Sequence, residues 1–219
     1  MPGSVDSCDC GTPTRIERLS NSVSRSFNNA HLADVTIYLG NVKLPAHSLV
    51  LASQSDYFDR ALKGQLKEGI KKEFKFTDGS MQGYWRVFEY MYTGAYSQGS
   101  TPCVDVPDDE ELVKDLRVYS LADYFIIDGL KTLALEKFKR KIREALLDDA
   151  FVDCVRNVYD ATHNSDEPIR KTVVKLCYRN ARILWEKKGT LQGLFHEGGD
   201  FAVELMEMIV NPPKEPASC

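Results

Sequence analysis

The chain has 219 residues, of which 43% are hydrophobic, 10% aromatic and 27% charged. This composition is typical of a folded globular chain that buries its own core, and the aromatic content argues against global disorder. The formal net charge of −4 does not suit a protein that grips nucleic acid non-specifically. No apolar run approaches the roughly 20 residues of a membrane span, so we expect neither a nucleic-acid nor a membrane partner.

Residues 1–13 are polar and rich in Pro, Gly and Ser, and we expect them to be disordered. They lack the apolar stretch of a secretory signal, which predicts a cytoplasmic or nuclear protein with reduced cysteines. Cys8 and Cys10 are the only cysteines close together, but their spacing is not that of a zinc knuckle and no histidine is near. We therefore expect no metal and no cofactor. Cys154 and Cys177 lie on apolar helical patterns that predict burial.

The first predicted element is a helix from Arg15, whose single narrow apolar stripe needs a surface to pack against. Residues 34–39 are then β-branched and aromatic, Gly40-Asn41 favours a turn, and residues 42–44 return as a second strand. This pattern predicts a hairpin. The apolar stripe of the helix consists of Ile16, Leu19, Val23 and Phe27.

Short elements are predicted next. Residues 45–52 open one short helix, and a second begins at Ser55, a good N-cap residue. Residues 73–76 alternate polar and apolar side chains, which indicates a half-buried strand. A longer helix with an aromatic face is expected between Ser80, its N-cap, and Gly94, its stop.

An aperiodic stretch, residues 95–107, predicts a loop. The acidic residues 108–111 are expected at the N-terminus of the next helix, where the macrodipole favours negative charge, and another helix follows Asp128. After residue 148 the chain reads as helical, including one helix from Pro168 to Leu184.

The predicted fold class is α+β: a small mixed sheet flanked by helices, followed by an all-helical C-terminal extension. Asp200 is expected to cap the last helix, and Pro212-Pro213 to end it. The predicted organisation has a lead at 1–13, the mixed unit at 14–143, the extension at 148–211 and a disordered tail at 212–219.

Six segments in order resemble those of a BTB (POZ) domain, and they cover residues 33–143. The version Leu-Ala-Asp-Tyr-Phe, with a long loop after Tyr-Thr-Gly, is most similar to fungal BTB proteins, and residues 148–211 resemble a truncated BACK-like region. The segments are Ala33–Ile37, Leu44–His47, Val50–Phe58, Phe88–Gly94, Tyr119–Phe125 and Ile127–Leu130. The signature residues within them are Asp34, His47, Tyr57, Phe58, Tyr92, Gly94, Ala122 and Asp123.

The resemblance implies a non-catalytic protein-interaction module. Many BTB domains form homodimers, and many recruit a cullin scaffold as substrate adaptors of a ubiquitin ligase. In the adaptors an apolar-x-Glu motif follows the short helix after the Tyr-Phe segment, and Leu66-Lys67-Glu68 stands at that place. The aromatic position that closes the Ala-Asp-x-Tyr segment matches Phe125, which lacks a hydroxyl. The cullin-binding candidates are Tyr57, Leu66, Glu68 and Phe125.

The resemblance also implies a dimer interface. Dimeric BTB domains place an element before the first strand that packs across the two-fold axis, and the helix from Arg15 stands there. The alternative is that this helix only covers its own domain. Corepressor-binding members pair the strand aspartate with a base just after the histidine, but Ser48 occupies that position, so we expect no such pocket. The dimer-interface candidates are Ile16, Leu19, Val23, Phe27 and Asp34.

Three functions remain open. The first is a homodimeric cullin adaptor with an unidentified substrate protein, recognised by the helical extension or by residues 1–13. The second is a dimeric scaffold or nuclear cofactor without a cullin partner. The third is a cysteine hydrolase, which would need a reactive thiol beside His47, His163 or His196. We expect no enzyme, since no Ser-His-Asp or Cys-His pattern exists and His47 is expected to be a hydrogen-bonded core residue.

Charge is uneven along the chain. Acidic residues gather at 105–115 and basic residues at 131–143. Two interpretations stay open: solvated helix faces that complement the helix dipoles, or a docking surface steered by charge. No aromatic residues interleave the basic run in a stacking pattern, so it does not indicate nucleic-acid binding.

Overall fold

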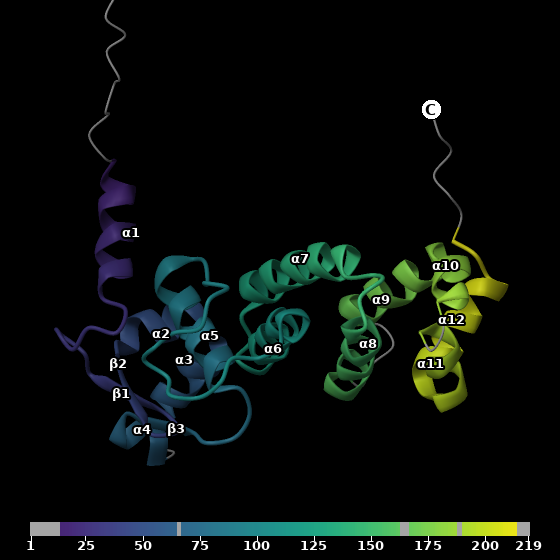
Figure 1. Ribbon diagram of the computed structural model, residues 1–219. Coiled ribbons are helices and arrows are strands. Elements are labelled where there is room, and N and C mark those ends of the chain that lie inside the picture. The colour runs from purple at the N-terminus through teal and green to yellow at the C-terminus, as the bar shows by residue number, and fades with distance from the viewer. Residues whose placement is uncertain (1–13, 65–66, 163–166, 188–189, 214–219) are drawn as a thin grey trace, which may run out of the picture.

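A computed structural model describes residues 14–64, 67–162, 167–187 and 190–213. Figure 1 shows an N-terminal half that holds the sheet, a C-terminal half made only of helices, and α6 and α7 between them. The predicted α+β class is confirmed. Buried apolar residues form one continuous cluster that reaches from Val35 in the first strand to Leu205 near the end of the chain. The helical extension therefore shares the core of the sheet-containing half.

The sheet has three strands in the order β2-β1-β3. β1 (Val35–Leu39) and β2 (Val42–Ala46) form the predicted antiparallel hairpin, and Gly40 in its turn has a positive φ of 57° that suits glycine. β3 (Glu73–Phe76) pairs with β1 in parallel. Parallel pairing needs a crossover connection, and three helices supply it: α2 (Ser48–Gln54), α3 (Asp56–Lys63) and α4 (Lys67–Lys71).

The predicted helix signals at Ser55, Ser80 and Gly94 are confirmed. The Ser55 hydroxyl accepts from the backbone N–H of Phe58 at the start of α3, and the Ser80 hydroxyl accepts from Gly83 at the start of α5 (Met81–Thr93). Gly94 ends α5 in the left-handed conformation with φ 72°. α5 is buried along most of its length, so its aromatic face belongs to the core.

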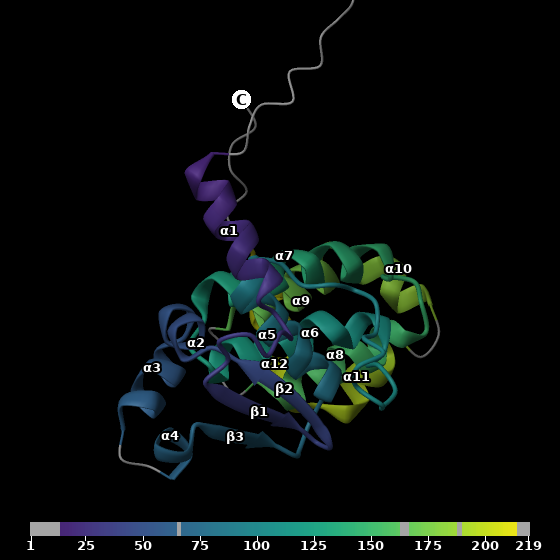
Figure 2. The same ribbon diagram turned by 90° about the vertical axis from the view of Figure 1, so that its left-hand side faces the viewer.

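α6 (Glu111–Tyr124) and α7 (Asp128–Glu144) pack closely and join the two halves. The helix predicted over residues 108–111 starts later than expected. Asp108 and Asp109 precede α6 because they bind basic side chains, as described below. α1 (Arg15–Arg25) precedes the sheet and projects from the molecule in both views (Figures 1 and 2).

The C-terminal half contains α8 (Ala150–Ala161), α9 (Pro168–Arg179), α10 (Ala181–Glu186), α11 (Leu191–Glu197) and α12 (Gly199–Val210). The single helix predicted from Pro168 to Leu184 is wrong. Asn180 interrupts it, with φ −115° and ψ 18°, and its side-chain amide donates to the Leu176 carbonyl at 2.9 Å in addition to its backbone N–H at 3.2 Å. No described helix is both long and apolar enough to cross a bilayer.

Candidate functional site

An aromatic cluster lies where α3 meets the end of α6. Phe125 is its centre: the ring is 0% exposed and stacks on Phe58, with centroids 5.2 Å apart and planes 16° apart. The Ser55 hydroxyl donates to the Phe125 carbonyl at 2.6 Å and fixes the backbone there. The prediction that Phe125 contacts a cullin is therefore corrected, since a fully buried ring offers no surface to a partner.

The neighbouring residue carries the exposed ring instead. Tyr124 is 54% exposed and its ring lies 5.2 Å from that of half-buried Tyr57, another predicted contact. Burial raises the pKa of Tyr57, and a hydrogen bond with Tyr124 and the charge of Glu68 raise it further. The Tyr57 hydroxyl thus stays protonated and able to donate. The exposed face formed by Tyr57 and Tyr124 thus carries hydroxyl groups, which Phe125 lacks.

Glu68 is exposed on α4, beside this aromatic face. α4 packs closely on α3 through Gly69, where an added Cβ would lie 2.2 Å from the Ala61 carbonyl oxygen. The absence of a side chain at Gly69 is what lets α4 place Glu68 there. Ile70, on the same helix, is 71% exposed. The third predicted residue, Leu66, lies outside the described residues.

α1 presents a second uncovered surface. Its capping box joins Thr14 and Glu17, and none of its residues is buried. Ile16 is 80% and Leu19 is 68% exposed, whereas the later stripe residues Val23 and Phe27 are half-buried on the core. The Phe27 ring lies 5.1 Å from that of Trp85. The chain thus covers the second half of the stripe itself and leaves the first half bare.

Asp34 is tied into its own domain. Its carboxylate accepts from the Ser48 backbone N–H at 2.8 Å and from the Ser48 hydroxyl at 2.7 Å, so it caps α2. Lys72 reaches the same carboxylate at 2.6 Å. Burial alone would raise its pKa, but the bonds from Lys72 and Ser48 outweigh this and lower the pKa of Asp34 to about 2. Residue 48 is not basic, as the sequence shows, but Lys72 supplies a base from elsewhere.

His47 is a fully used hydrogen-bonding residue. Its Nε2 faces the His31 carbonyl at 2.9 Å, so this nitrogen carries the proton, and its Nδ1 accepts from the Tyr92 hydroxyl at 2.9 Å. The His47 backbone N–H in turn donates to the same hydroxyl. Burial raises the pKa of Tyr92 to about 12. Both ring nitrogens of His47 are therefore held by hydrogen bonds within the domain.

The described cysteines give no support to a hydrolase. Cys154 and Cys177 are buried, and burial raises the pKa of each thiol to about 12, so neither forms a thiolate near neutral pH. Cys103 is exposed beside Asn28. Within the described part of the chain no cluster of His, Cys, Asp and Glu could hold a metal. Cys8, Cys10 and His163 lie outside it.

Two uncovered surfaces and a tied-down histidine suit a binding module, and the sequence comparisons decide the family. The sequence model of the BTB/POZ domain matches residues 23–142, more than half of the chain. The chain belongs to the BTB/POZ domain family. Several BTB signature residues are structural, since Phe58, Tyr92 and Ala122 are buried and Gly94 ends α5, whereas Asp123 is exposed and pairs with Lys131 at 2.6 Å.

Several curated relatives carry the same domain. Human Kelch-like protein 5 is 31% identical over 78 residues, which is 36% of this chain and 10% of the relative. Mouse Kelch-like protein 1 is 33% identical over 78 residues, covering 36% and 9%. Mouse zinc finger and BTB domain-containing protein 44 is 32% identical over 79 residues, covering 36% and 17%. The chain spans less than a fifth of the length of these relatives.

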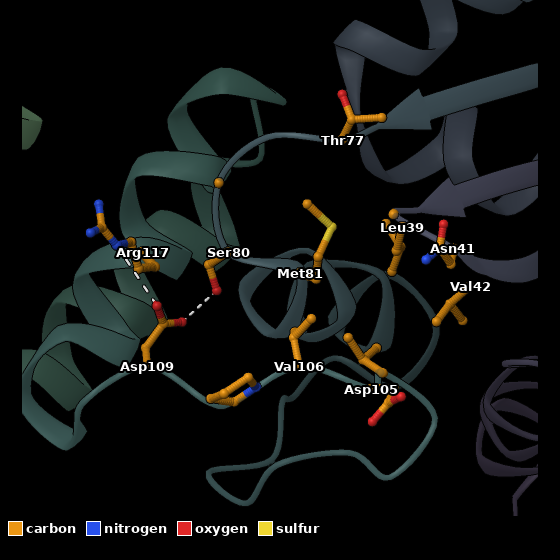
Figure 3. Close-up of a pocket in the computed structure, with 14 residues that line it drawn as sticks. Leu39, Asn41, Val42, Thr77, Ser80, Met81, Asp105, Val106, Asp109 and Arg117 are labelled. Carbon is orange, nitrogen blue, oxygen red and sulfur yellow. Dashed lines mark hydrogen bonds and ion pairs between the residues drawn. The ribbon is translucent and has the colours of Figure 1, made fainter.

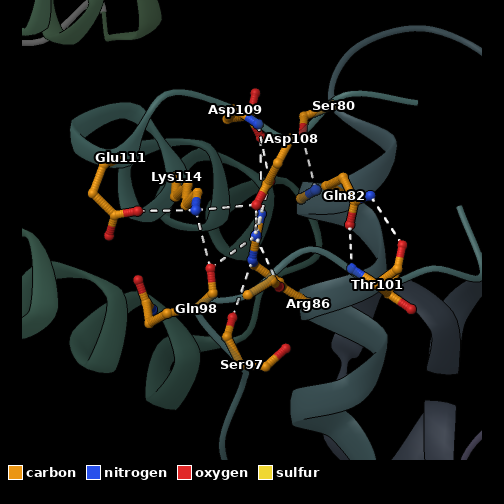
Figure 4. A network of polar contacts seen from close by, with 12 residues as sticks. Ser80, Gln82, Arg86, Ser97, Gln98, Thr101, Asp108, Asp109, Glu111 and Lys114 are labelled. Carbon is orange, nitrogen blue, oxygen red and sulfur yellow. Dashed lines mark hydrogen bonds and ion pairs between the residues drawn. The ribbon is translucent and has the colours of Figure 1, made fainter. Parts of the chain in front are cut away.

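The BTB domain also contains a buried polar network that the sequence did not reveal (Figure 4). Arg86, on the otherwise apolar α5, is 1% exposed and donates to the Ser97 carbonyl at 3.1 Å and to Asp108 at 2.6 and 2.8 Å. One turn away, Gln82 donates to the carbonyls of the loop and accepts from the Thr101 N–H at 3.0 Å. Two polar residues four apart on an apolar helix, before a long loop, were the available signal.

The uneven charges that the sequence showed are partly paired with each other. Lys141 of α7 lies 2.7 Å from Glu111 and 2.9 Å from Asp115, which is itself buried on α6. Lys114 bridges Glu111 and Asp108. These pairs join α6 to α7 and to the loop, while Asp105 and Glu110 of the same acidic stretch are exposed.

A pocket of about 690 Å³ opens between the β1–β2 turn and the loop before α6 (Figure 3). Met81, Leu39 and Val106 give it an apolar side. At its polar end Asp109 accepts from the Ser80 hydroxyl and lies 3.9 Å from Arg117. These groups fix the start of α5 against the loop.

Proposed function

We propose that this protein is a homodimeric BTB adaptor that recruits a cullin scaffold. The carrying observation is the uncovered face where exposed Tyr124 packs beside Tyr57, with the exposed Glu68 close enough for its charge to raise the pKa of Tyr57. Exposed apolar and aromatic groups with a charged neighbour are what a protein docking site presents. The resemblance to cullin-recruiting BTB domains supports the same assignment, with Tyr124 in the role first given to Phe125.

The test is titration of the purified N-terminal region of the BTB-recruited cullin against the full chain, with calorimetry as the readout. Tyr124→Ala and Glu68→Ala are each expected to weaken binding by about tenfold or more, as truncation of central contacts does. Leu147→Ala is the matched control, since Leu147 is as exposed as Tyr124 (54%) but lies in the turn between α7 and α8. Its affinity should equal that of the unmodified chain.

Two outcomes contradict the cullin assignment. A chain that binds no cullin at tens of micromolar, roughly the weak end of specific association, would leave a dimeric scaffold or nuclear cofactor as the function. Equal loss in Leu147→Ala and Tyr124→Ala would place the docking surface elsewhere. Leu66→Asp extends the test to the motif residue outside the described part of the chain.

Dimerisation is proposed through α1. Its bare first half, with Ile16 and Leu19, would be covered by a second copy in a self-complementary contact. Light scattering on a sizing column should give twice the monomer mass for the chain and the monomer mass for the double variant Ile16→Asp/Leu19→Asp. Ile183→Asp/Leu147→Asp, with residues exposed elsewhere, should remain dimeric. A double α1 variant that stays dimeric would show that α1 only covers its own domain.

The extension is proposed to take part in substrate recognition, because α8–α12 lie wholly beyond the matched residues 23–142 and fold onto the same core. Its likeness to a BACK region, the fungal affinity of the BTB segment and a location in cytoplasm or nucleus stay predictions. So do the boundaries at 143 and 148, which fall near the end of α7 and the start of α8.

A further inference from the structure

We propose that the groove between α7 and α9 binds an extended, Asp/Glu-rich peptide segment of a partner protein. The groove measures about 360 Å³. Five of the side chains that line it are basic and one is acidic. The charged lining residues are Glu136, Lys139 and Arg143 from α7, and Lys171, Lys175 and Arg179 from α9.

The bases of α7 divide into two faces. Away from the groove, two lysines form ion pairs within the protein. Lys131 pairs with Asp123 and Glu167. Lys141 pairs with Glu111 and Asp115. On the groove face Arg143 makes no ion pair with any described carboxylate, and the same holds for Lys175 and Arg179 across the groove. All three are exposed.

Such a gathering of unpaired like charge is unfavourable in the isolated chain, since the three cations repel one another. The chain as a whole carries −4, so the positive potential here is local rather than a property of overall composition. A negatively charged occupant would remove the repulsion and gain attraction. Charge complementarity therefore favours an anionic partner in the groove.

Spacing favours an extended peptide. Lys171, Lys175 and Arg179 recur every fourth residue on α9, so their side chains follow one another roughly 6 Å apart. In an extended chain every second side chain points the same way, at a repeat of about 6.6 Å. Acidic residues at alternate positions of a short peptide therefore match the basic row on α9.

The lining also separates a peptide from a nucleic acid. No aromatic side chain lines the groove for bases to stack on. Its remaining lining residues include half-buried Leu176, which offers a small apolar floor to the backbone and methylenes of a Glu-rich segment. An acidic peptide uses both the charges and this floor, whereas a phosphodiester strand uses only the charges.

The negative charge of Glu136 is expected to weaken the binding of an anionic ligand in the groove. Its carboxylate lies 2.7 Å from Lys139, which it partly neutralises, and it is the acidic member of the lining. Removing this charge frees Lys139 for the ligand. Glu136→Gln is therefore expected to tighten binding, an effect that misfolding cannot imitate.

The experiment uses the full chain and a fluorescein-labelled peptide of about eight residues with alternating Glu and Ser, followed by anisotropy. Lys175→Glu/Arg179→Glu should weaken binding by about tenfold or more, and Glu136→Gln should tighten it by roughly two- to fivefold, in line with single exposed charge pairs. Raising the salt concentration from about 50 to about 300 mM should weaken peptide binding by the unmodified chain and by each variant. If the charge-reversal variant Lys175→Glu/Arg179→Glu fails to fold, Lys175→Gln/Arg179→Gln replaces it, with a smaller expected loss of peptide affinity.

The matched control is Lys43→Glu/Lys71→Glu, which changes the net charge equally at two exposed lysines of the BTB domain. It should bind the peptide as the unmodified chain does. An equal loss in this control, or an unchanged affinity in both groove variants, overturns the proposal. Tighter binding of a single-stranded oligonucleotide of the same charge, displaced by the groove variants, would also overturn it in favour of nucleic acid. No step depends on the cullin proposal.

Discussion

Each half of the molecule is organised by one buried arginine in a helix. In the BTB half it is Arg86 of α5, 1% exposed, and in the helical half it is Arg170 of α9, 3% exposed. Neither was predicted, because both stand in apolar helical patterns. A guanidinium carries five donors in a planar fork, so one side chain can satisfy several acceptors at once.

The two arginines differ in what they hold. Arg86 fastens a loop to a helix, mostly through backbone carbonyls, and its carboxylate partner Asp108 is nearly buried. Arg170 fastens helices to one another: it donates to the Thr162 hydroxyl at 2.7 Å at the end of α8, and to Asp200 and Glu204 of α12. Asp200 is 69% exposed. Asp108 and Glu204 are similarly buried, at 14% and 13% exposed, so the two networks differ in that the second also opens to water at Asp200.

The largest expected effect comes from breaking the Arg86 network. Arg86→Met should lower the free energy of unfolding by about 3–5 kcal/mol, because Asp108 and the loop carbonyls lose their buried donor. Urea unfolding followed by circular dichroism measures it. Arg182→Met, at an exposed i,i+4 pair, is the control and should cost under about 1 kcal/mol. If Arg86→Met lowers the free energy of unfolding no more than Arg182→Met does, the buried network does not stabilise the fold.

Breaking the Arg170 network should cost less. Arg170→Met is expected to lower the free energy of unfolding by about 1–3 kcal/mol, since water can take over the exposed Asp200 carboxylate while Thr162 loses its buried donor. The same urea titration compares it directly with Arg86→Met. If Arg170→Met proves the more damaging of the two, exposure of the partners does not control the cost.

A third change tests the seam between the halves. The Tyr119 hydroxyl of α6 donates to Glu167, just before α9, at 2.6 Å, and burial together with this bond raises the pKa of Tyr119. Tyr119→Phe should cost about 1–2 kcal/mol, as for a hydrogen bond to a charged group. Tyr178→Phe is the control, since its hydroxyl bonds to no described residue. Equal melting temperatures for the two variants would show that the Tyr119–Glu167 hydrogen bond does not stabilise the contact between the two halves.

The smallest effect concerns pH and Asp34. Its pKa falls from the ordinary 3.8 to about 2 in the folded chain, so its contribution is complete above pH 4, roughly its unfolded pKa, and is lost as the pH falls through about 2. Because Asp34 and Lys72 are nearly half exposed, we expect under about 1 kcal/mol. Unfolding curves between pH 5 and pH 2 should converge for the unmodified chain and Asp34→Asn. A constant gap would contradict the assignment.

Local signals were predictable from the sequence. The caps at Ser55 and Ser80 and the stop at Gly94 depend only on neighbouring residues, and the family segments rest on such positions. The burial of Phe125 and the exposure of Tyr124 were not predictable. α6 ends between them and Ile126 takes a φ of 56°, so helical periodicity no longer tells which ring points inward.

Long-range pairings were equally hidden. Lys72 reaches Asp34 only because β3 lies beside β1, and the parallel register of these strands follows from no local pattern. The unpaired groove bases could not be told from the paired bases of the same helix, since the partners of Lys141 stand some thirty positions earlier. In each case the deciding neighbour is distant in sequence.

The parallel β1–β3 pair also sets an order in time. In the hairpin Val35 faces Ala46, eleven positions away, so it can close early and locally. Thr36 faces Glu73, thirty-seven positions away, and the intervening chain must first be gathered into α2, α3 and α4. The outer edge of β1 therefore stays open until the crossover helices are in place. During synthesis that edge is the stretch of this chain most in need of protection from other strands.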